Sequence, residues 1–147
     1  MNTTQLFTEF LRADQSLTSS TALTTITGFS AAMEANRAYG FESEIHFNLA
    51  GIVSGQKFSV ITPASPTNAL YKIEIVNGTG LTIAALSLSA PLAAALATTG
   101  LHLAKLGGVI ENGANAGNLA IQFAQNVSDA SAITIKRGSF FKVWNIT

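Results

Sequence analysis

The sequence predicts an all-β protein, with about eight to ten antiparallel strands folded as a jelly-roll sandwich or barrel behind a short N-terminal arm. The segment Val109–Ile146 alternates strand and turn signals, and its Asn112-Gly113 pair accepts the positive φ that a tight turn requires. Ala38–Leu49 alternates apolar and polar side chains, which is the period of a strand with one buried face. No segment has the period of a long helix. A jelly roll fits best, since about ten short strands fill two sheets in a chain of 147 residues.

Met1–Leu11 has a pattern that differs from the rest of the chain. Its apolar side chains have the spacing of one stripe on a short helix, and they are Leu6, Phe7, Phe10 and Leu11. A helix this short is unstable alone in water. We therefore expect residues 1–13 to form an arm that packs either on its own barrel or on a neighbouring subunit, in front of one jelly-roll domain of residues 14–147.

The first half of the domain contains the strongest strand signal. Asp14–Phe29 is rich in Ser and Thr and predicts two short or bulged strands. In Ala38–Leu49 the side chains expected on the buried face are Tyr39, Phe41, Ser43, Ile45, Phe47 and Leu49. Gln56–Thr62 predicts the next strand, with Phe58 and Val60 pointing inward.

The second half continues the alternation of strands and turns. Asn68–Val76 predicts a strand that the turn Asn77-Gly78-Thr79-Gly80 joins to a second buried strand. Pro91–Thr98 forms either one short helical turn or a loop over the barrel mouth. Leu101–Ile110 resumes as a strand, in which Gly107-Gly108 indicates a bulge. The last strand has large apolar side chains on both faces, so either a neighbouring subunit or the N-terminal arm covers the second face; these side chains are Phe140, Phe141, Val143, Trp144 and Ile146.

Composition limits the classes of partner. Apolar residues make up 48% of the chain and charged residues only 11%, and eight basic and eight acidic side chains cancel. A surface so poor in charge is poorly soluble on a lone monomer, so we expect partners to cover much of it. Nucleic acid is not an expected partner, because no basic cluster is larger than Lys136-Arg137. The uncharged stretch between Glu74 and Lys105 is interrupted by Gly, Pro, Ser, Thr and Asn, so we expect no membrane span.

Few residues have the chemistry that catalysis needs. His46 lies on the expected polar face of its strand beside Glu42 and Glu44, and residues two apart on a strand point the same way. A solvated strand face accounts for the same three residues, and the chain has no cysteine to complete a metal site. Asp129 lies in a turn, where its carboxylate is expected to bond its own backbone. We predict a non-enzymatic protein with no catalytic residues, metal or cofactor.

Several of these segments together form a signature. Asn112–Gly117 precedes an alternating strand that ends in Ala124–Asn126, and Ser128–Ala130 and Gly138-Ser139 follow it. Upstream, Met33–Tyr39 matches the same pattern. The pattern resembles that of a small jelly-roll domain common in tailed-phage virion proteins, whose members are similar to the trimeric jelly rolls of the tumour-necrosis-factor and C1q type.

The resemblance implies a non-enzymatic virion structural protein. Many members lie at the ends of long tail or fibre proteins, whereas this chain shows only a short arm upstream. That difference favours a homotrimer that is made in the cytoplasm of a bacterial host, binds the major capsid protein and decorates the capsid exterior. A tail-fibre or head-fibre tip that binds a host receptor or glycan is the alternative, and a jelly-roll hydrolase or lyase lacks the His and carboxylate clusters it needs. We expect the capsid or a neighbour to contact Leu6, Phe7, Phe10 and Leu11, and the trimer interface to contain Phe141 and Val143.

Overall fold

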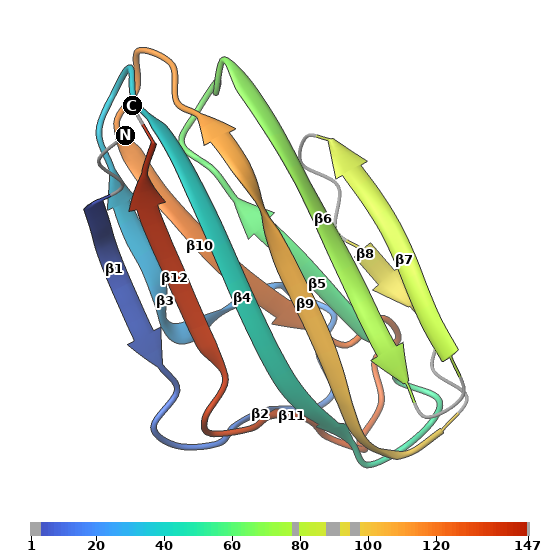
Figure 1. Cartoon of the computed structure of the whole chain (residues 1–147). Coiled ribbons are helices and arrows are strands. Elements are labelled where there is room, and N and C mark those ends of the chain that lie inside the picture. The colour runs from blue at the N-terminus through green and yellow to red at the C-terminus, as the bar shows by residue number, and fades with distance from the viewer. Residues whose placement is uncertain (1–3, 78–79, 88–91, 95–97, 147) are drawn as a thin grey trace.

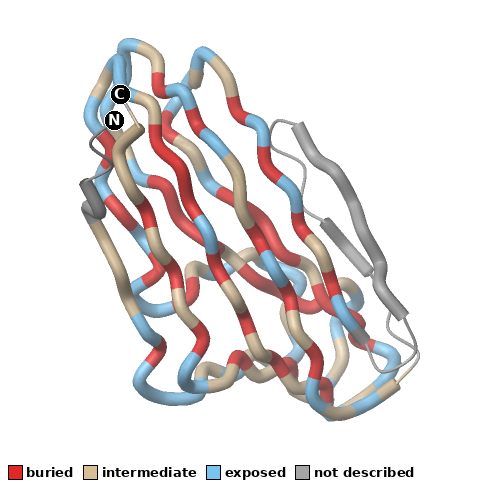
Figure 2. Tube along the Cα trace, viewed as in Figure 1, coloured by how far each residue is buried: buried red, intermediate tan, exposed pale blue. Residues whose placement is uncertain are grey.

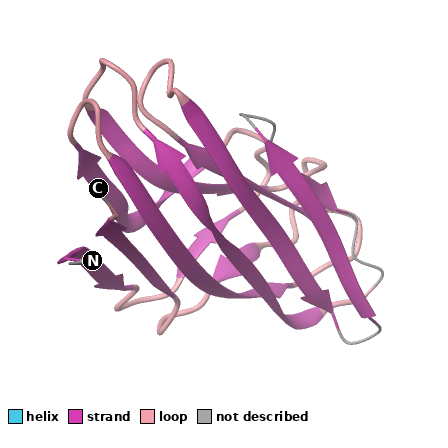
Figure 3. Cartoon of the chain, turned by 45° about the horizontal axis from the view of Figure 1, so that its top comes forward, coloured by secondary structure: helices cyan, strands magenta, loops and turns pink. Residues whose placement is uncertain are grey.

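The structure is a computed structural model that describes residues 4–77, 80–87, 92–94 and 98–146. Within these ranges the chain forms strands and loops and no helix (Figure 3). The strands of the described ranges are β1 (Thr4–Phe10), β2 (Gln15–Leu17), β3 (Thr24–Met33), β4 (Ala38–Leu49), β5 (Gln56–Ile61), β6 (Asn68–Asn77), β7 (Gly80–Ser87), β8 (Leu92–Ala94), β9 (Gly100–Glu111), β10 (Gly117–Ala124), β11 (Ile133–Ile135) and β12 (Phe140–Asn145).

The strands form two antiparallel sheets that pack face to face (Figure 1). The large sheet has the order β1-β12-β4-β9-β6-β7. The short strand β11 of this sheet pairs with the part of β4 that extends beyond β12. Strand β2 then pairs with the free edge of β11, as β1 pairs with the free edge of β12. The small sheet has the order β3-β10-β5-β8. The predicted antiparallel, all-β sandwich is confirmed.

The strand order is that of a jelly roll. If the short β2–β11 pair and the β6–β7 hairpin are set aside, eight strands remain, and they alternate between the two sheets in a fixed pattern. When these eight strands are numbered along the chain, the large sheet has the order first, eighth, third and sixth, which are β1, β12, β4 and β9. The small sheet has the order second, seventh, fourth and fifth, which are β3, β10, β5 and β8. This arrangement wraps two Greek keys around one core. The β6–β7 hairpin widens the large sheet beyond β9.

The core lies between the sheets and follows the alternation of the strands (Figure 2). On β4 the side chains predicted to point inward are all buried. Phe47 of β4 meets Phe58 of β5 with ring centroids 5.3 Å apart, and Phe29 of β3 stacks on Phe141 of β12 at 5.8 Å. These contacts join the two sheets, and they belong to one core cluster whose apolar burial drives folding.

The N-terminal arm is a strand and not the predicted helix. β1 pairs along its length with β12 of the same chain, from Thr4 opposite Asn145 to Phe10 opposite Phe140, with one irregularity between Gln5 and Phe7. The edge of β12 offers a row of backbone hydrogen-bond partners, whereas a helix of this length has no stability of its own. Of the two predicted positions, the arm packs on its own sandwich.

Three further sequence predictions have definite outcomes. The β6–β7 hairpin is confirmed by the pairing of Asn77 with Gly80, although residues 78–79 lie outside the described ranges. Leu92–Ala94 is strand β8, so both alternatives predicted there, a helical turn and a loop, are wrong for these residues. Residues 91 and 95–97 of that segment are not described. The bulge predicted at Gly107-Gly108 is also wrong, since β9 pairs with both neighbours through these two positions without an extra residue.

Candidate assembly surfaces

The residues predicted to touch a capsid or a neighbour lie on different sides of β1. Leu11 is buried in the core of its own subunit, and Phe7 packs partly buried against Phe141 with ring centroids 5.7 Å apart. Phe10 points outward, half exposed, beside Phe140. The side chain of Leu6 lies outside the described part of the structure. Of the described side chains of this group, Phe10 alone is open to a partner.

The predicted trimer-interface residues face the wrong way for that role. Phe141 and Val143 are buried between the two sheets of their own subunit, with 0% and 1% exposure. A neighbouring subunit cannot reach these side chains without opening the sandwich. On β12 the outward positions are instead Phe140, Lys142 and Trp144. The last strand therefore remains a candidate contact, but through the other set of side chains.

By the outer face of the large sheet we mean the outward residues of β12, β4, β9 and β6. This face carries three rows of paired side chains that cross all four strands. One row is apolar, the second has a gap at Gly107, and the third alternates in charge after an aromatic ring. The rows are Trp144–Gly40–Val109–Leu70, Lys142–Glu42–Gly107–Lys72 and Phe140–Glu44–Lys105–Glu74.

The charges of this face neutralise one another. Lys142 pairs with Glu42 at 3.0 Å, Lys105 with Glu44 at 3.7 Å, and Lys72 with Glu74 at 2.5 Å. These pairs are solvent-exposed, and exposed pairs contribute about 0–1 kcal/mol each to stability. Their more important effect is that the three rows together have no net charge, and Glu111 at the end of β9 gives the whole face a single negative charge, so it repels a second copy of itself only weakly.

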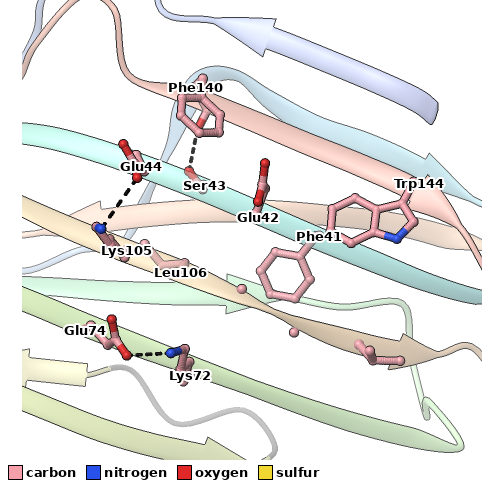
Figure 4. Close-up of a pocket in the computed structure, with 13 residues that line it drawn as sticks. Phe41, Glu42, Ser43, Glu44, Lys72, Glu74, Lys105, Leu106, Phe140 and Trp144 are labelled. Carbon is pink, nitrogen blue, oxygen red and sulfur yellow. Dashed lines mark hydrogen bonds and ion pairs between the residues drawn. The ribbon is translucent and has the colours of Figure 1, made fainter.

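A hollow lies at the centre of the outer face. Gly107 has no side chain to fill the space between Glu42 and Lys72, which leaves a cavity of about 430 Å3 that is open to solvent. Trp144 and Phe140 line it on the β12 side, and the Lys72–Glu74 pair lines it on the β6 side (Figure 4).

Trp144 lies directly over Gly40. A Cβ atom on Gly40 would lie only 2.3 Å from the indole Cε2 atom, so the ring rests on the bare backbone of β4. Glycine is the residue that permits so close an approach. The indole is therefore held flat at one end of the hollow.

Most of the large exposed apolar side chains among the described residues lie on two parts of the surface, although the charged rows separate the residues of the first part. Leu101 and Leu70, 64% and 57% exposed, belong to the outer face of the large sheet. Val76 and Val109 lie on the same face and Phe10 at its β1 edge. The sequence signal for these positions was present, because Leu101, Leu103 and Val109 alternate with the buried residues of β9, but only the strand register shows which set faces solvent.

A second group of exposed apolar residues lies at one end of the sandwich. Ile52, Val53 and Val127 are 53%, 62% and 50% exposed, and we call these three residues the apolar tip. They lie in the loop from β4 to β5 and in the loop from β10 to β11. Val127 donates its backbone N–H to the carbonyl of Ser54 at 2.8 Å, which places the two loops side by side. The sequence signal for this group is the presence of apolar residues in two predicted turns, and this surface was not among the predicted contacts.

The histidines and carboxylates do not assemble into a site. Glu44 and Glu42 pair with lysines, and the backbone of His46 is bonded to Ser139 and Lys136. Among the residues that the structure describes, no group of three or more His, Cys, Asp or Glu side chains lies close enough to hold a metal ion. Asp129 accepts the backbone N–H of Ser131 at 2.7 Å, which confirms the predicted turn.

Asp14 fastens the end of the arm to the turn before β12. Its carboxylate forms an ion pair with Lys136 and accepts the backbone N–H of Arg137 at 2.8 Å. The hydrogen bond from Lys136, and then the bond from Arg137, hold the pKa of Asp14 below its usual value. A carboxylate whose pKa is lowered by folding stabilises the folded state above its unfolded pKa, and this stabilisation disappears as the pH falls through the folded pKa.

We therefore expect Asp14→Asn to lower the melting temperature slightly near neutral pH. The difference from the wild type should shrink progressively below about pH 4, where the wild-type carboxylate also becomes neutral. Thermal unfolding followed by circular dichroism over a pH series measures this. A difference that stays constant to the acid end of the series would contradict the role given to the Asp14 charge.

In the described part of the chain, no helix is long and apolar enough to cross a membrane.

No family model and no curated protein sequence matches this chain. Among solved structures, it is similar to infectious bursal disease virus of the Gx strain, with 13% identity and a TM-score of 0.29. It is similar also to the VP2 subviral particle of infectious bursal disease virus, with 14% identity and a TM-score of 0.28. These matches cover 99% of this chain but 42% and 41% of the matched chains, so the chain spans about two fifths of their length. Matches at this level do not define a family for the chain.

Proposed function

We propose that this chain is a non-enzymatic structural protein of a tailed-phage virion, which assembles as a homotrimer and decorates the capsid exterior by binding the major capsid protein. The observation that carries the proposal is the distribution of exposed apolar side chains. Among the described residues, the large exposed apolar side chains lie on the outer face of the large sheet, with Phe10 at its edge, and in the apolar tip. Ile61 is the exception.

Two separate apolar surfaces suit a protein that binds both its own copies and a second partner. The outer face of the large sheet is the surface assigned to the copies, because it is broad and the charges of its three rows cancel. The jelly-roll strand order agrees with the fold that the sequence signature implies, which adds support from an independent feature of the chain.

The trimer is tested by placing carboxylates on the outer face. Leu70 and Leu101 are more than half exposed in one subunit, so the double variant Leu70→Glu, Leu101→Glu should fold normally. In an assembled trimer the new charges are buried without partners, which costs several kcal/mol and raises the dissociation constant by about 100-fold or more. Mass photometry and sedimentation equilibrium over a concentration series measure the change.

A matched control is available on the opposite side of the molecule. Ile61 is 40% exposed on the small sheet, and Ile61→Glu should leave the oligomer intact. A wild-type protein that stays monomeric at micromolar concentration rejects the trimer. An unchanged oligomer in the double variant rejects the assignment of this face to the copies.

Binding to the virion requires a separate experiment. Heads of the encoding phage, prepared without this protein, are mixed with the purified chain and sedimented. Saturable co-sedimentation with heads supports decoration, whereas co-sedimentation with host cells supports the alternative of a receptor-binding fibre tip.

The hollow beside Trp144 favours one particular form of that alternative. A flat indole next to a neutral rim of paired carboxylates and ammonium groups suits a sugar ring, which has an apolar face and a rim of hydroxyls. Trp144 is the only tryptophan of the chain, so its fluorescence reports directly on this hollow. A saturable fluorescence change with neutral oligosaccharides, in a protein that is monomeric, would favour glycan binding over assembly through this face.

A further inference from the structure

The apolar tip differs from an ordinary surface loop because the structure holds it rigidly. Ile52, Val53 and Val127 are each at least half exposed, yet two backbone hydrogen bonds join the loops that carry them. Ala50 donates its backbone N–H to the carbonyl of Ala132 at 3.0 Å, and Val127 donates to Ser54 at 2.8 Å.

A single buried side chain organises this end of the sandwich. Gln125 is fully buried, and its amide nitrogen donates to the carbonyls of Asp129 and Ser131 at 2.9 and 2.7 Å. Its amide oxygen accepts the backbone N–H groups of Ser20 and Asp129 at 3.0 and 3.1 Å. Since every hydrogen-bonding position of the amide is used, it fixes the loops 18–23 and 125–132 before any partner binds, and loop 50–55 is joined to them by the bonds of Ala50 and Ser54. Fixing a surface in advance reduces the entropy that binding costs.

The chemistry of the tip selects the class of partner. The loops 18–23, 50–55 and 125–132 contain one charged residue, Asp129, whose carboxylate is bonded to Ser131. The nearby amine of Lys57 donates to the carbonyl of Thr21. Binding to anionic lipid or to nucleic acid requires several lysines or arginines on one surface. The tip therefore fits an uncharged, apolar protein surface.

The position of the tip shows how copies would present it. The tip follows the end of β4, whereas Asn145 near the C-terminus pairs with Tyr39 at the start of β4, so the tip and the chain termini lie at opposite ends of the sandwich (Figure 1). Copies that associate through the outer faces of their large sheets, around an axis along the strands, direct all their tips the same way.

The small size of the tip also limits what it can bind. Three aliphatic side chains cover much less than the roughly 800 Å2 per partner of a stable interface. One tip alone gives a weak contact, and several tips on one rigid assembly give a strong one if the partner repeats its binding site at matching spacing. The regular surface of a shell repeats in this way.

We infer that the apolar tip is the surface by which the trimer seats on the capsid, with Ile52, Val53 and Val127 of each copy entering apolar depressions on the shell. This inference rests on the proposed function. It replaces the N-terminal arm as the shell contact, because Leu11 and Phe7 are committed to the core of their own subunit.

The test compares binding to heads of the encoding phage, prepared without this protein. The double variant Val53→Ser, Val127→Ser removes two apolar side chains from each copy, and Ile61→Ser is the matched control on the small sheet. We expect the double variant to remain trimeric and to melt close to the wild type, while its affinity for heads falls by about 100-fold or more, because the loss is multiplied over the copies. The control should bind as the wild type does. The isosteric double variant Val53→Thr, Val127→Thr keeps the shape of the loops and should also weaken binding to heads. It shows whether a loss of binding in the serine variant comes from lost apolar contact and not from misfolding.

The outcomes separate the inference from the proposed function. Heads that bind wild type and both tip variants equally well overturn the inference and leave decoration standing. Wild-type protein that is monomeric, or that binds no heads, rejects the proposed function itself. Co-sedimentation of wild-type protein with phosphatidylcholine vesicles, lost in the tip variants, would overturn the inference in favour of a lipid surface.

Discussion

The variant Gly108→Ala is expected to lose about 3 kcal/mol or more of unfolding free energy, or not to fold at all. A Cβ atom at this position would lie 2.1 Å from the carbonyl oxygen of Leu70 and 2.5 Å from the Cα atom of Tyr71. Both atoms belong to the backbone of the neighbouring strand β6, so no side-chain rotation relieves the clash. The two strands must separate, which breaks backbone pairing in the middle of the large sheet.

The aromatic rings on either side explain why the chain is so close-packed here. Phe41 on β4 and Tyr71 on β6 both pair with Gly108, and their ring centroids lie 6.2 Å apart across it. The missing side chain leaves room for the rings to meet over the glycine. A methyl group would disturb this aromatic contact in addition to the backbone.

Gly107→Ala is the matched control, one residue away on the same strand. Its Cβ atom would point outward and lie 3.2 Å from the carbonyl oxygen of Phe41, which a small shift accommodates. We expect a loss below about 1 kcal/mol. Urea unfolding followed by circular dichroism, at a fixed protein concentration, measures both variants. Equal effects of the two substitutions would show that the clash at Gly108 does not determine stability.

Most of the fold was predictable because single strands carry their own signal. The alternation in Ala38–Leu49 identifies the inward residues of β4 without any knowledge of its neighbours. The helix predicted for Met1–Leu11 failed because an apolar segment on its own does not show which neighbour it will have. Pairing with β12 set the conformation of β1, which is a tertiary effect that local spacing does not contain.

The assembly surfaces were less predictable because they depend on register. Large apolar residues on both faces of β12 were visible in the sequence, but choosing Phe141 and Val143 as the outward set required knowing which face meets the core. A shift of one residue exchanges the two sets, so Phe140 and Trp144 are the outward ones, and both are partly exposed. The apolar tip depends on the approach of two loops that are distant in the sequence, which no local pattern indicates.

The variant Gln125→Glu is expected to lower the unfolding free energy by about 4 kcal/mol near neutral pH. The substitution keeps the size of the side chain but removes both N–H donors, which in the wild type bond the carbonyls of Asp129 and Ser131. It places a fully buried negative charge against those two carbonyl oxygens. Unsatisfied buried polar groups cost about 1–3 kcal/mol each, and an unpaired buried charge costs more.

The pH dependence separates this explanation from a simple packing defect. Burial raises the pKa of an introduced carboxyl group, so the folded state of the variant binds a proton that the unfolded state does not. Its stability should therefore recover in part as the pH is lowered from neutral to about 5, while the wild type changes little. Gln122→Glu is the control, since Gln122 is only partly buried on the small sheet and its amide has a single long hydrogen bond, to Thr25 at 3.4 Å. Urea unfolding at the two pH values gives the comparison. A loss at Gln125 that matches the control, or that does not depend on pH, would mean that the loops at this end hold together without the amide, and the rigidity of the tip would then not come from Gln125.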